Sequence, residues 1–506
     1  MTTAERTRPG ARHEADRPGG WLVPLMVVTL GSFLSALDTS SVNVALPSIE
    51  RALSASADDG RWVSTGYSLA MGVAIPLSKW LGDRIGISRL YVICLAVFTA
   101  GSTLCGLAWD IGSMIAFRVL QGVPGGLLGV LGMTLLFATV PREKIGMAMG
   151  LYGLGIIVAP GVGPAMGGWF VENSTWQMIF FIKIPIGIAA VVAAWRILPR
   201  TGATGRPRFD LWGFVTVAAG LSTLLIATAQ GNDWGWTSYP TVILLFASAL
   251  AFALFVVVEN SVETPLLDLG VFRSRPYTIG LLIVVLVTVA MFGSLFYIPQ
   301  LLLGVMQLDA LEAGLVMMPS ALVMAAMAPV AGRLYDRFGA RLPVFTGLSI
   351  TALACALMAQ VTTDVSEIDI IGWSVLFNLG IGVSMMPAMS VGMNALPPHR
   401  IPSGSALNQV AIRSVSALAV AGLGAVLTVL QAQLMVGESD LMPVGPRMPP
   451  MLAHAAEEGG VAMQALYGAM RLDVAATAFA DMFLVLGGCA AIGALLGLLL
   501  PGPKPR

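Results

Sequence analysis

The sequence predicts an all-α polytopic membrane protein with fourteen transmembrane helices, arranged as two six-helix halves plus two linker helices. Two observations carry this prediction, and a repeated motif described below divides the helices into halves. Of the 506 residues, 56% are hydrophobic and only 11% are charged, whereas a soluble globular protein carries about 25% charged residues. The chain also contains successive apolar segments of about 20 residues, the length that crosses a bilayer as a helix.

The apolar segments define the expected elements in order. They begin near residues 21, 61, 88, 112, 145, 176, 211, 238, 276, 311, 342, 370, 404 and 474. No cleavable signal peptide is expected, because a full-length apolar segment begins directly at Trp21 after a mixed-charge tail. The expected organisation is a tail (1–20), an N-terminal half (21–200), two linker helices (201–262), a C-terminal half (263–500) with an extracytoplasmic loop (437–473), and a second tail (501–506).

The basic residues orient the helices. With fourteen spans, most Lys and Arg outside the spans fall on one side of the membrane. The exceptions are Arg51, Arg61, Arg447 and Arg471. Cytoplasmic loops are the ones enriched in Lys and Arg, so we expect both termini in the cytoplasm.

A motif occurs twice, once in each predicted half. LGDRIGISRL (Leu81–Leu90) follows the second segment, and LYDRFGARLP (Leu334–Pro343) follows the tenth. Repeated halves are typical of secondary transporters, and Asp and Arg in so short a loop can stabilise helix ends. Ordinary cytoplasmic positive charge is the alternative interpretation. The candidate gating residues of the two copies are Asp83, Arg84, Gly86, Asp336, Arg337 and Gly339.

The fifth segment contains an uncharged stretch rich in glycine and proline, GLGIIVAPGVGPAMGG (Gly153–Gly168). A membrane helix tolerates Pro and Gly when neighbouring helices cover the loosened backbone, and small residues admit a close neighbour. We therefore expect a kinked helix that packs against the tenth helix, where the halves move against each other. Its candidate gating residues are Pro160, Gly163, Pro164, Gly167 and Gly168.

Four segments resemble signatures of the major facilitator superfamily, in its fourteen-span drug:proton antiporter branch of EmrB/QacA type. They are LDTSSVNVALP (Leu37–Pro47), FRVLQGVPGG (Phe117–Gly126), APGVGPAMGG (Ala159–Gly168) and WQMIFFIKIPIG (Trp176–Gly187). The fifth and sixth spans look closest to EmrB, the inner-membrane pump of a three-part efflux system. The resemblance implies a major facilitator fold and proton-coupled export of amphipathic molecules, or multidrug efflux, from the cell inner membrane.

Other sources of energy and other chemistry find no support in the sequence. None of the four lysines follows a glycine, so the G-x-x-x-x-G-K loop that binds ATP phosphates is missing. The four cysteines lie in apolar segments, which indicates neither disulfides nor a metal site. The net charge is zero, which argues against nucleic acid as a partner. We expect no enzyme activity, no cofactor and no metal, and a proton gradient as the driving force.

Charged residues inside spans are costly and usually functional. Counted along their helices, Asp38, Arg118 and Lys183 fall in one layer of the N-terminal half. We expect Asp38 to be the carboxylate that binds and releases the proton, held by Arg118 and Lys183. The alternative is a structural ion pair that never titrates. Lys183 departs from the resemblance, because the family usually has Asn at this position.

The candidate substrate-binding residues are polar or deformable side chains within the spans. Met385 and Met389 lie four residues apart on one helical face, and Met suits promiscuous apolar binding. Core or lipid-facing packing is the alternative for either residue. The full candidate set is Asn43, Gln121, Gln300, Met385, Met389 and Arg413. Basic residues outnumber acids within the spans, which favours neutral, zwitterionic or anionic substrates over cations.

The expected partners are small amphipathic substrates, protons and the lipid bilayer. The EmrB resemblance adds a periplasmic adaptor, which the outward segment Gly437–Asp473 would contact. A flexible cover is the other interpretation of that segment. Two other functions also stay open: an exporter or exchanger of one defined metabolite or lipid-like compound, and a non-transporting membrane scaffold.

Overall fold

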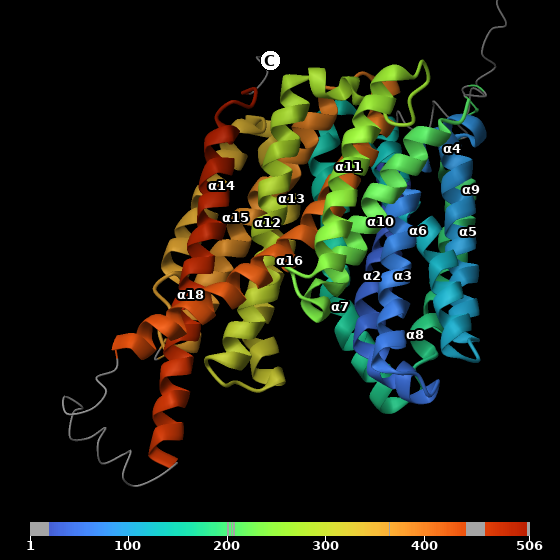
Figure 1. Ribbon diagram of the computed structural model, residues 1–506. Helices are drawn as coiled ribbons and strands as arrows, with labels where there is room; N and C mark the ends of the chain where they lie inside the picture. Colours follow the sequence, from blue (N-terminus) through green and yellow to red (C-terminus); the bar gives the residue numbers. More distant parts are fainter. Residues whose placement is uncertain are drawn as a thin grey trace, which may run out of the picture.

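The computed structural model describes residues 20–199, 202–203, 205, 208–363, 365–441 and 461–502. Every regular element within these residues is a helix. The chain forms an elongated bundle in which the N-terminal half (blue to teal) lies beside the C-terminal half (yellow to red), as Figure 1 shows. We call the end of the bundle where α2 begins and α18 ends the proximal end, at the top of Figure 1, and the opposite end the distal end.

The N-terminal half contains six predicted spans, two of which are interrupted. Proline causes one of the interruptions. Pro185 lacks the amide that would bond to the carbonyl of Phe181, where α8 ends. The elements are α2 (Leu22–Ala52), α3 (Ala57–Ala74), α4 (Leu77–Ile85), α5 (Ile87–Gly106), α6 (Ile111–Thr139), η1 (Arg142–Lys144), α7 (Ile145–Asn173), α8 (Met178–Phe181) and α9 (Lys183–Ile197).

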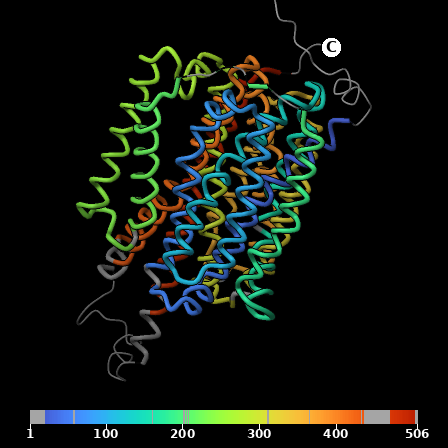
Figure 2. Tube along the Cα trace, turned by 90° about the vertical axis from the view of Figure 1, so that its right-hand side faces the viewer, coloured from blue at the N-terminus to red at the C-terminus, as the bar shows by residue number. Residues whose placement is uncertain are grey.

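The two linker helices and the C-terminal half follow in the expected order. The linker pair packs on α3 and α16 through α10 and stands at one edge of the bundle in Figure 2 (green). The elements are α10 (Leu211–Trp234), α11 (Tyr239–Ser261), η2 (Leu269–Arg273), α12 (Arg275–Gly304), α13 (Ala310–Phe338), α14 (Arg341–Met358), α15 (Glu367–Asn394), η3 (Pro398–Arg400), α16 (Ile401–Leu441) and α18 (Val461–Gly497).

Thirteen helices of the described chain are long and apolar enough to cross a membrane. The expected second span is not among them, because it begins with Asp58, Asp59 and Arg61 and is interrupted after Ala74. Its two pieces, α3 and α4, nevertheless run in line with the bundle beside α6. The result is the architecture expected for fourteen spans.

The last helix is longer than the span predicted within it. The span was expected to begin near residue 474; the part of α18 that can cross a membrane begins at Met470, whereas α18 itself begins at Val461. The helix therefore includes part of the expected outward loop 437–473, and α16 extends to Leu441 at the other end of that loop. The remaining loop residues, 442–460, lie outside the described residues, as do 1–19 and 503–506 of the expected tails.

The two halves meet through α7 and α13. A Cβ on Gly146 would overlap the backbone of Gly332, and a Cβ on Gly150 would overlap the carbonyl of Ala328. Both contacts lie near the start of α7 and the end of α13, at the proximal end. Farther along α7, a Cβ on Gly161 or Gly168 would meet nothing within 4 Å. The described conformation therefore joins the halves at the proximal end.

Candidate ion-pair site and gate

Three helices of the N-terminal half place the predicted charged residues together. Asp38 lies in the middle of α2, Arg118 lies in α6, and Lys183 is the first residue of α9. Arg118 and Gln121 are three residues apart, so they share one face of α6. All four side chains are buried, with at most 1% exposed. We call Asp38, Arg118, Gln121 and Lys183 the ion-pair cluster.

The Asp38 carboxylate accepts a hydrogen bond from each of the other three members. Arg118 Nη1 donates to Oδ2 and Lys183 Nζ donates to Oδ1, and both contacts are ion pairs. Gln121 Nε2 donates to Oδ1 at 3.3 Å. Donors of this kind favour the charged form of a carboxylate. The cluster therefore holds two cations and one anion, with a net charge of +1.

Arg118 has the more complete surroundings of the two cations. Its Nη1 also donates to Gln121 Oε1 at 2.9 Å, and its Nε donates to the carbonyl of Val63 at 3.3 Å. The guanidinium lies 3.9 Å from the ring centroid of Tyr67, a cation–π contact. Lys183 has Asp38 and a looser contact with the Phe180 ring at 4.9 Å. Arg118 is thus fixed from several sides, whereas Lys183 depends mainly on Asp38.

Tyr67 is a site residue that sequence reasoning missed. It is fully buried in α3, and its hydroxyl lies 3.3 Å from the Ser35 hydroxyl. An aromatic residue in the span beside a predicted buried arginine was the available signal. The Tyr67 ring contacts Arg118 of α6, while its hydroxyl reaches Ser35 of α2.

The candidate substrate residues do not form one group in the structure. Asn43 accepts a hydrogen bond from Ser64 at 2.7 Å and lines a cavity of about 250 Å³ beside α10, together with Gln230. Gln121 is enclosed in the ion-pair cluster, with no exposed surface to offer a ligand in this conformation. The structure therefore places these two polar residues in different surroundings from each other.

The remaining candidates lie in the C-terminal half. Met385 and Gln300 are half-buried, in α15 and α12, and Met389 is buried. Met386, their neighbour, contacts α7 at the position of Gly153. Arg413 is half-buried in α16, and no ion-pair partner for it is found among the described residues. Arg413 is thus the candidate whose charge is available to bind a substrate.

The two copies of the repeated motif have the same backbone geometry. Gly86 ends α4 with φ 95°, and Gly339 ends α13 with φ 73°. L-residues with a side chain rarely adopt these angles, so glycine is required at both turns. Each glycine amide donates to the carbonyl four residues earlier, at 2.8 Å and 2.9 Å. The repeat in the sequence is therefore a repeat in structure.

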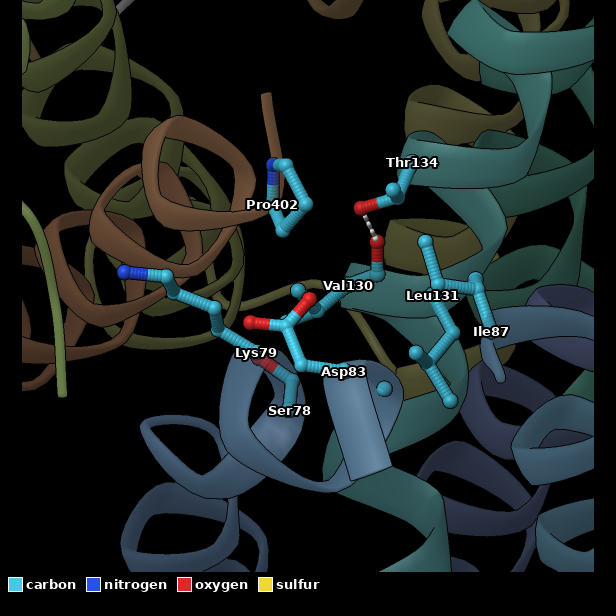
Figure 3. A pocket seen from close by; sticks show the side chains of 9 residues that line it. Ser78, Lys79, Asp83, Ile87, Val130, Leu131, Thr134 and Pro402 are labelled. Carbon is cyan, nitrogen blue, oxygen red and sulfur yellow. Dashed lines mark hydrogen bonds between the residues drawn. The ribbon is translucent and has the colours of Figure 1, made fainter. Parts of the chain in front are cut away.

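The aspartate of the second copy joins the two halves. Asp336 of α13 accepts hydrogen bonds from the backbone amides of Gly146 and Met147, each at 2.9 Å. Those amides belong to the first turn of α7, where a negative charge is stabilised by the helix dipole. In the first copy, Asp83 lines a small pocket together with Pro402 at the start of α16 (Figure 3). Both aspartates therefore lie beside the first turn of a helix in the opposite half.

The glycine-rich stretch is helical throughout α7, as expected. Helix α7 also packs against α13, the expected tenth helix. The glycines in direct contact with α13 are Gly146 and Gly150, which precede the stretch. Within the stretch, a Cβ on Gly163 would overlap Ser40, and a Cβ on Gly167 would lie 2.7 Å from the carbonyl of Ser41. These two glycines therefore lie against α2 of the same half.

Comparison with known proteins decides the family. Residues 28–421 match the family model described as "Major Facilitator Superfamily". The chain belongs to the major facilitator superfamily. This superfamily member is thus a transporter and a multi-pass membrane protein. A solved structure of the proton:xylose symporter XylE shares the fold, with a TM-score of 0.61 over 95% of this chain and 96% of that chain, at 13% identity.

Three relatives with named functions have sequences that are about one-third identical to that of this chain. The tetracenomycin C resistance and export protein of Streptomyces glaucescens is 32% identical over 86% of this chain and 82% of its own length. The multidrug export protein EmrB of Haemophilus influenzae is 32% identical over 77% of both chains. EmrB of Escherichia coli is 31% identical over 76% of both chains. The EmrB-type resemblance of the sequence is confirmed.

Proposed function

We propose that this transporter exports amphipathic small molecules across the cell inner membrane in exchange for protons, by alternating access. Asp38 is the residue that binds and releases the proton. The observation that carries the proposal is the burial of the Asp38 carboxylate between Arg118 and Lys183, within helices that cross the membrane. The proximal end is the cytoplasmic end, in agreement with the distribution of Lys and Arg.

The charge balance of the ion-pair cluster links proton binding to movement. A proton on Asp38 would leave Arg118 and Lys183 facing each other without an anion. Removing one partner from a buried ion pair costs about 3–5 kcal/mol. Asp38 also has no exposed surface through which a proton could arrive. Proton binding therefore requires α6 or α9 to move away from α2, and this requirement supports a role for the cluster in coupling.

The names of the relatives support export as the direction of transport. Two of them are named export proteins, for tetracenomycin C and for multiple drugs. The stretch in α7 supports the same direction through its resemblance to the antiporter motif. Its glycines also let α7 and α2 pack closely within the half that holds Asp38. Exchange of a single metabolite is the competing function, and the transport panel described below separates the two.

The charge of Arg413 supports neutral, zwitterionic or anionic substrates. Arg413 is half-buried and has no ion-pair partner among the described residues, and such a cation attracts acidic groups and repels permanent cations. Met385 and Met389 supply deformable apolar surface in the same half. A periplasmic adaptor remains part of the proposal on the EmrB resemblance alone, because the outward residues 442–460 lie outside the described chain. We propose no cofactor.

The proposal is tested with purified protein in liposomes and a chemically diverse panel of amphiphiles, with and without a pH gradient. We expect several unrelated neutral or acidic compounds to be transported, faster when the gradient is imposed. Transport of one compound alone would replace multidrug export with metabolite exchange. Rates that do not respond to the gradient would overturn proton coupling.

A further inference from the structure

Two acidic side chains face each other at the base of the linker helices. Asp210 caps the start of α10, and Glu259 lies in the last turn of α11. They are 7% and 4% exposed. An oxygen of Glu259 and the Asp210 carboxylate both lie within 3.0 Å of the point where a Cβ on Gly213 would stand. The two carboxylates therefore share one enclosed space, remote in sequence from the ion-pair cluster.

Each carboxylate uses one oxygen and leaves the other without a partner. Asp210 Oδ1 accepts from the Gly213 amide at 2.8 Å, and Glu259 Oε1 accepts from the Leu267 amide at 3.2 Å. Asp210 Oδ2 and Glu259 Oε2 are buried and have no hydrogen-bond partner within the part of the chain that the structure describes. A buried acceptor without a donor costs about 1–3 kcal/mol, and more when it is charged. Each of these two oxygens therefore lacks a hydrogen atom to accept.

Lys79 of α4 is the nearby cation. It lies beside the segment that bonds to Glu259, because Leu267 is two residues after Pro265. Its Nζ, however, donates to the carbonyl of Pro265 at 3.3 Å rather than to either carboxylate. From η2, Asp268 is already paired with Arg400. Among the described residues, the enclosed space thus contains two acids and has Lys79 beside it.

We propose that Asp210 and Glu259 bind one proton between them and form a proton-binding site in the linker helices, separate from Asp38. The proton comes from water at the proximal end and forms one O–H bond, while the second carboxylate accepts the resulting hydrogen bond. The protonated pair carries a charge of −1, which Lys79 balances. Two like charges in such proximity disfavour joint ionisation, and the two groups titrate as a pair.

The site is connected to the first copy of the repeated motif. Lys79 lies four residues before Asp83 on α4, and the adjacent Trp80 packs on Phe209 with ring centroids 4.8 Å apart. Loss of the proton leaves two negative charges beside Lys79 and attracts its ammonium away from Pro265. The protonation of the linker pair therefore acts on α4, the helix that carries Asp83.

Infrared spectroscopy of the purified full-length protein tests the site, because a protonated carboxylic acid has a C=O stretch that a carboxylate lacks. We expect a buried carboxylic acid band at neutral pH that is lost in Glu259→Gln and retained in Glu263→Gln, an exposed neighbour. The absence of such a band in the wild type, or its persistence in Glu259→Gln, would overturn the proposal.

A second variant guards against misfolding of the first. Lys79→Met removes the cation and keeps both acids, so the band should persist to a pH higher by about one unit. An unchanged titration would contradict the proposed arrangement. Monodisperse elution and an unchanged amide band show that each variant is folded. These spectra need no substrate, so their outcome is independent of whether Asp38 couples transport to protons.

Discussion

Arg118 of α6 donates a hydrogen bond to the carboxylate of Asp38 in α2, and neither side chain has more than 1% of its surface exposed. Lys183 donates to the other carboxylate oxygen. The ion pair therefore links α2 to α6, and neither water nor lipid reaches the two charges to take the place of either partner. A change to any one of the three residues should therefore alter the thermal stability of the protein and its transport to different extents.

Replacing Asp38 alone should damage folding as well as function. Asp38→Asn leaves two buried cations without an anion, at a cost of about 3–5 kcal/mol. The double variant Asp38→Asn/Lys183→Met retains the net charge of +1 and should recover most of the lost thermal stability. It should still show no proton-driven transport. Thermal unfolding in detergent and transport in liposomes measure the two effects, and a double variant with normal pH-dependent transport would exclude Asp38 as the proton site.

The two cations should not be equivalent. Arg118→Gln loses bonds to Asp38, Gln121 and the Val63 carbonyl and its contact with Tyr67, whereas Lys183→Gln loses little beyond Asp38. We expect Arg118→Gln to lower the unfolding temperature clearly and Lys183→Gln to leave it nearly unchanged. Arg118→Lys should resemble Arg118→Gln, since a lysine lacks the guanidinium fork. Equal destabilisation by the two glutamine variants would contradict this account.

The hydrogen bonds of Asp336 should hold the proximal end closed. Asp336→Ala removes two bonds to a charged acceptor, each of about 1.5–3 kcal/mol. The population should shift towards a conformation open at the proximal end. Spin-label distances between the starts of α7 and α14 report this shift. Glu143→Gln, an exposed change at the same end, is the control, and equal distance distributions for both variants would refute the role of Asp336.

Packing of α7 on α2 gives a matched set of glycine variants. Gly167→Ala would place a Cβ 2.7 Å from the Ser41 carbonyl, a backbone atom that cannot turn away. Gly161→Ala and Gly168→Ala meet nothing within 4 Å. We expect Gly167→Ala to reduce efflux at least about tenfold, equivalent to about 1.4 kcal/mol, and the other two to transport normally. Uniform behaviour across the three would show that close packing here is irrelevant.

The sequence was most informative about features that depend on residues close together in the chain, such as the length of a helix and the position of a charge within it. The helix order, the repeated motif that contains Gly86 and Gly339, and the layer of Asp38, Arg118 and Lys183 could all be predicted from segment length and position. Contacts between helices could not. Gly163 and Gly167 face α2 rather than α13, because the direction in which a helix presents its glycines depends on how α7 crosses its neighbours.

Other features depend on side chains that no motif marks. Tyr67 lies in a span of low hydropathy, and only its place in the span beside the predicted buried Arg118 could have marked it. Asp210 and Glu259 are separated by a full helical hairpin, so their approach follows from the packing of α10 on α11. The spacing of the two residues along the chain does not predict that contact.

Proton flux driven by a substrate gradient tests whether this transporter exchanges substrate for protons through Asp38. Liposomes containing the protein, a transported amphiphile and a pH-sensitive dye are diluted into substrate-free buffer. Antiport predicts that substrate leaving the vesicle drives protons inward, so that the lumen becomes acidic, and that Asp38→Asn/Lys183→Met abolishes the signal. A lumen that becomes alkaline with the wild type, or acidification that persists in the double variant, would contradict proton exchange through Asp38.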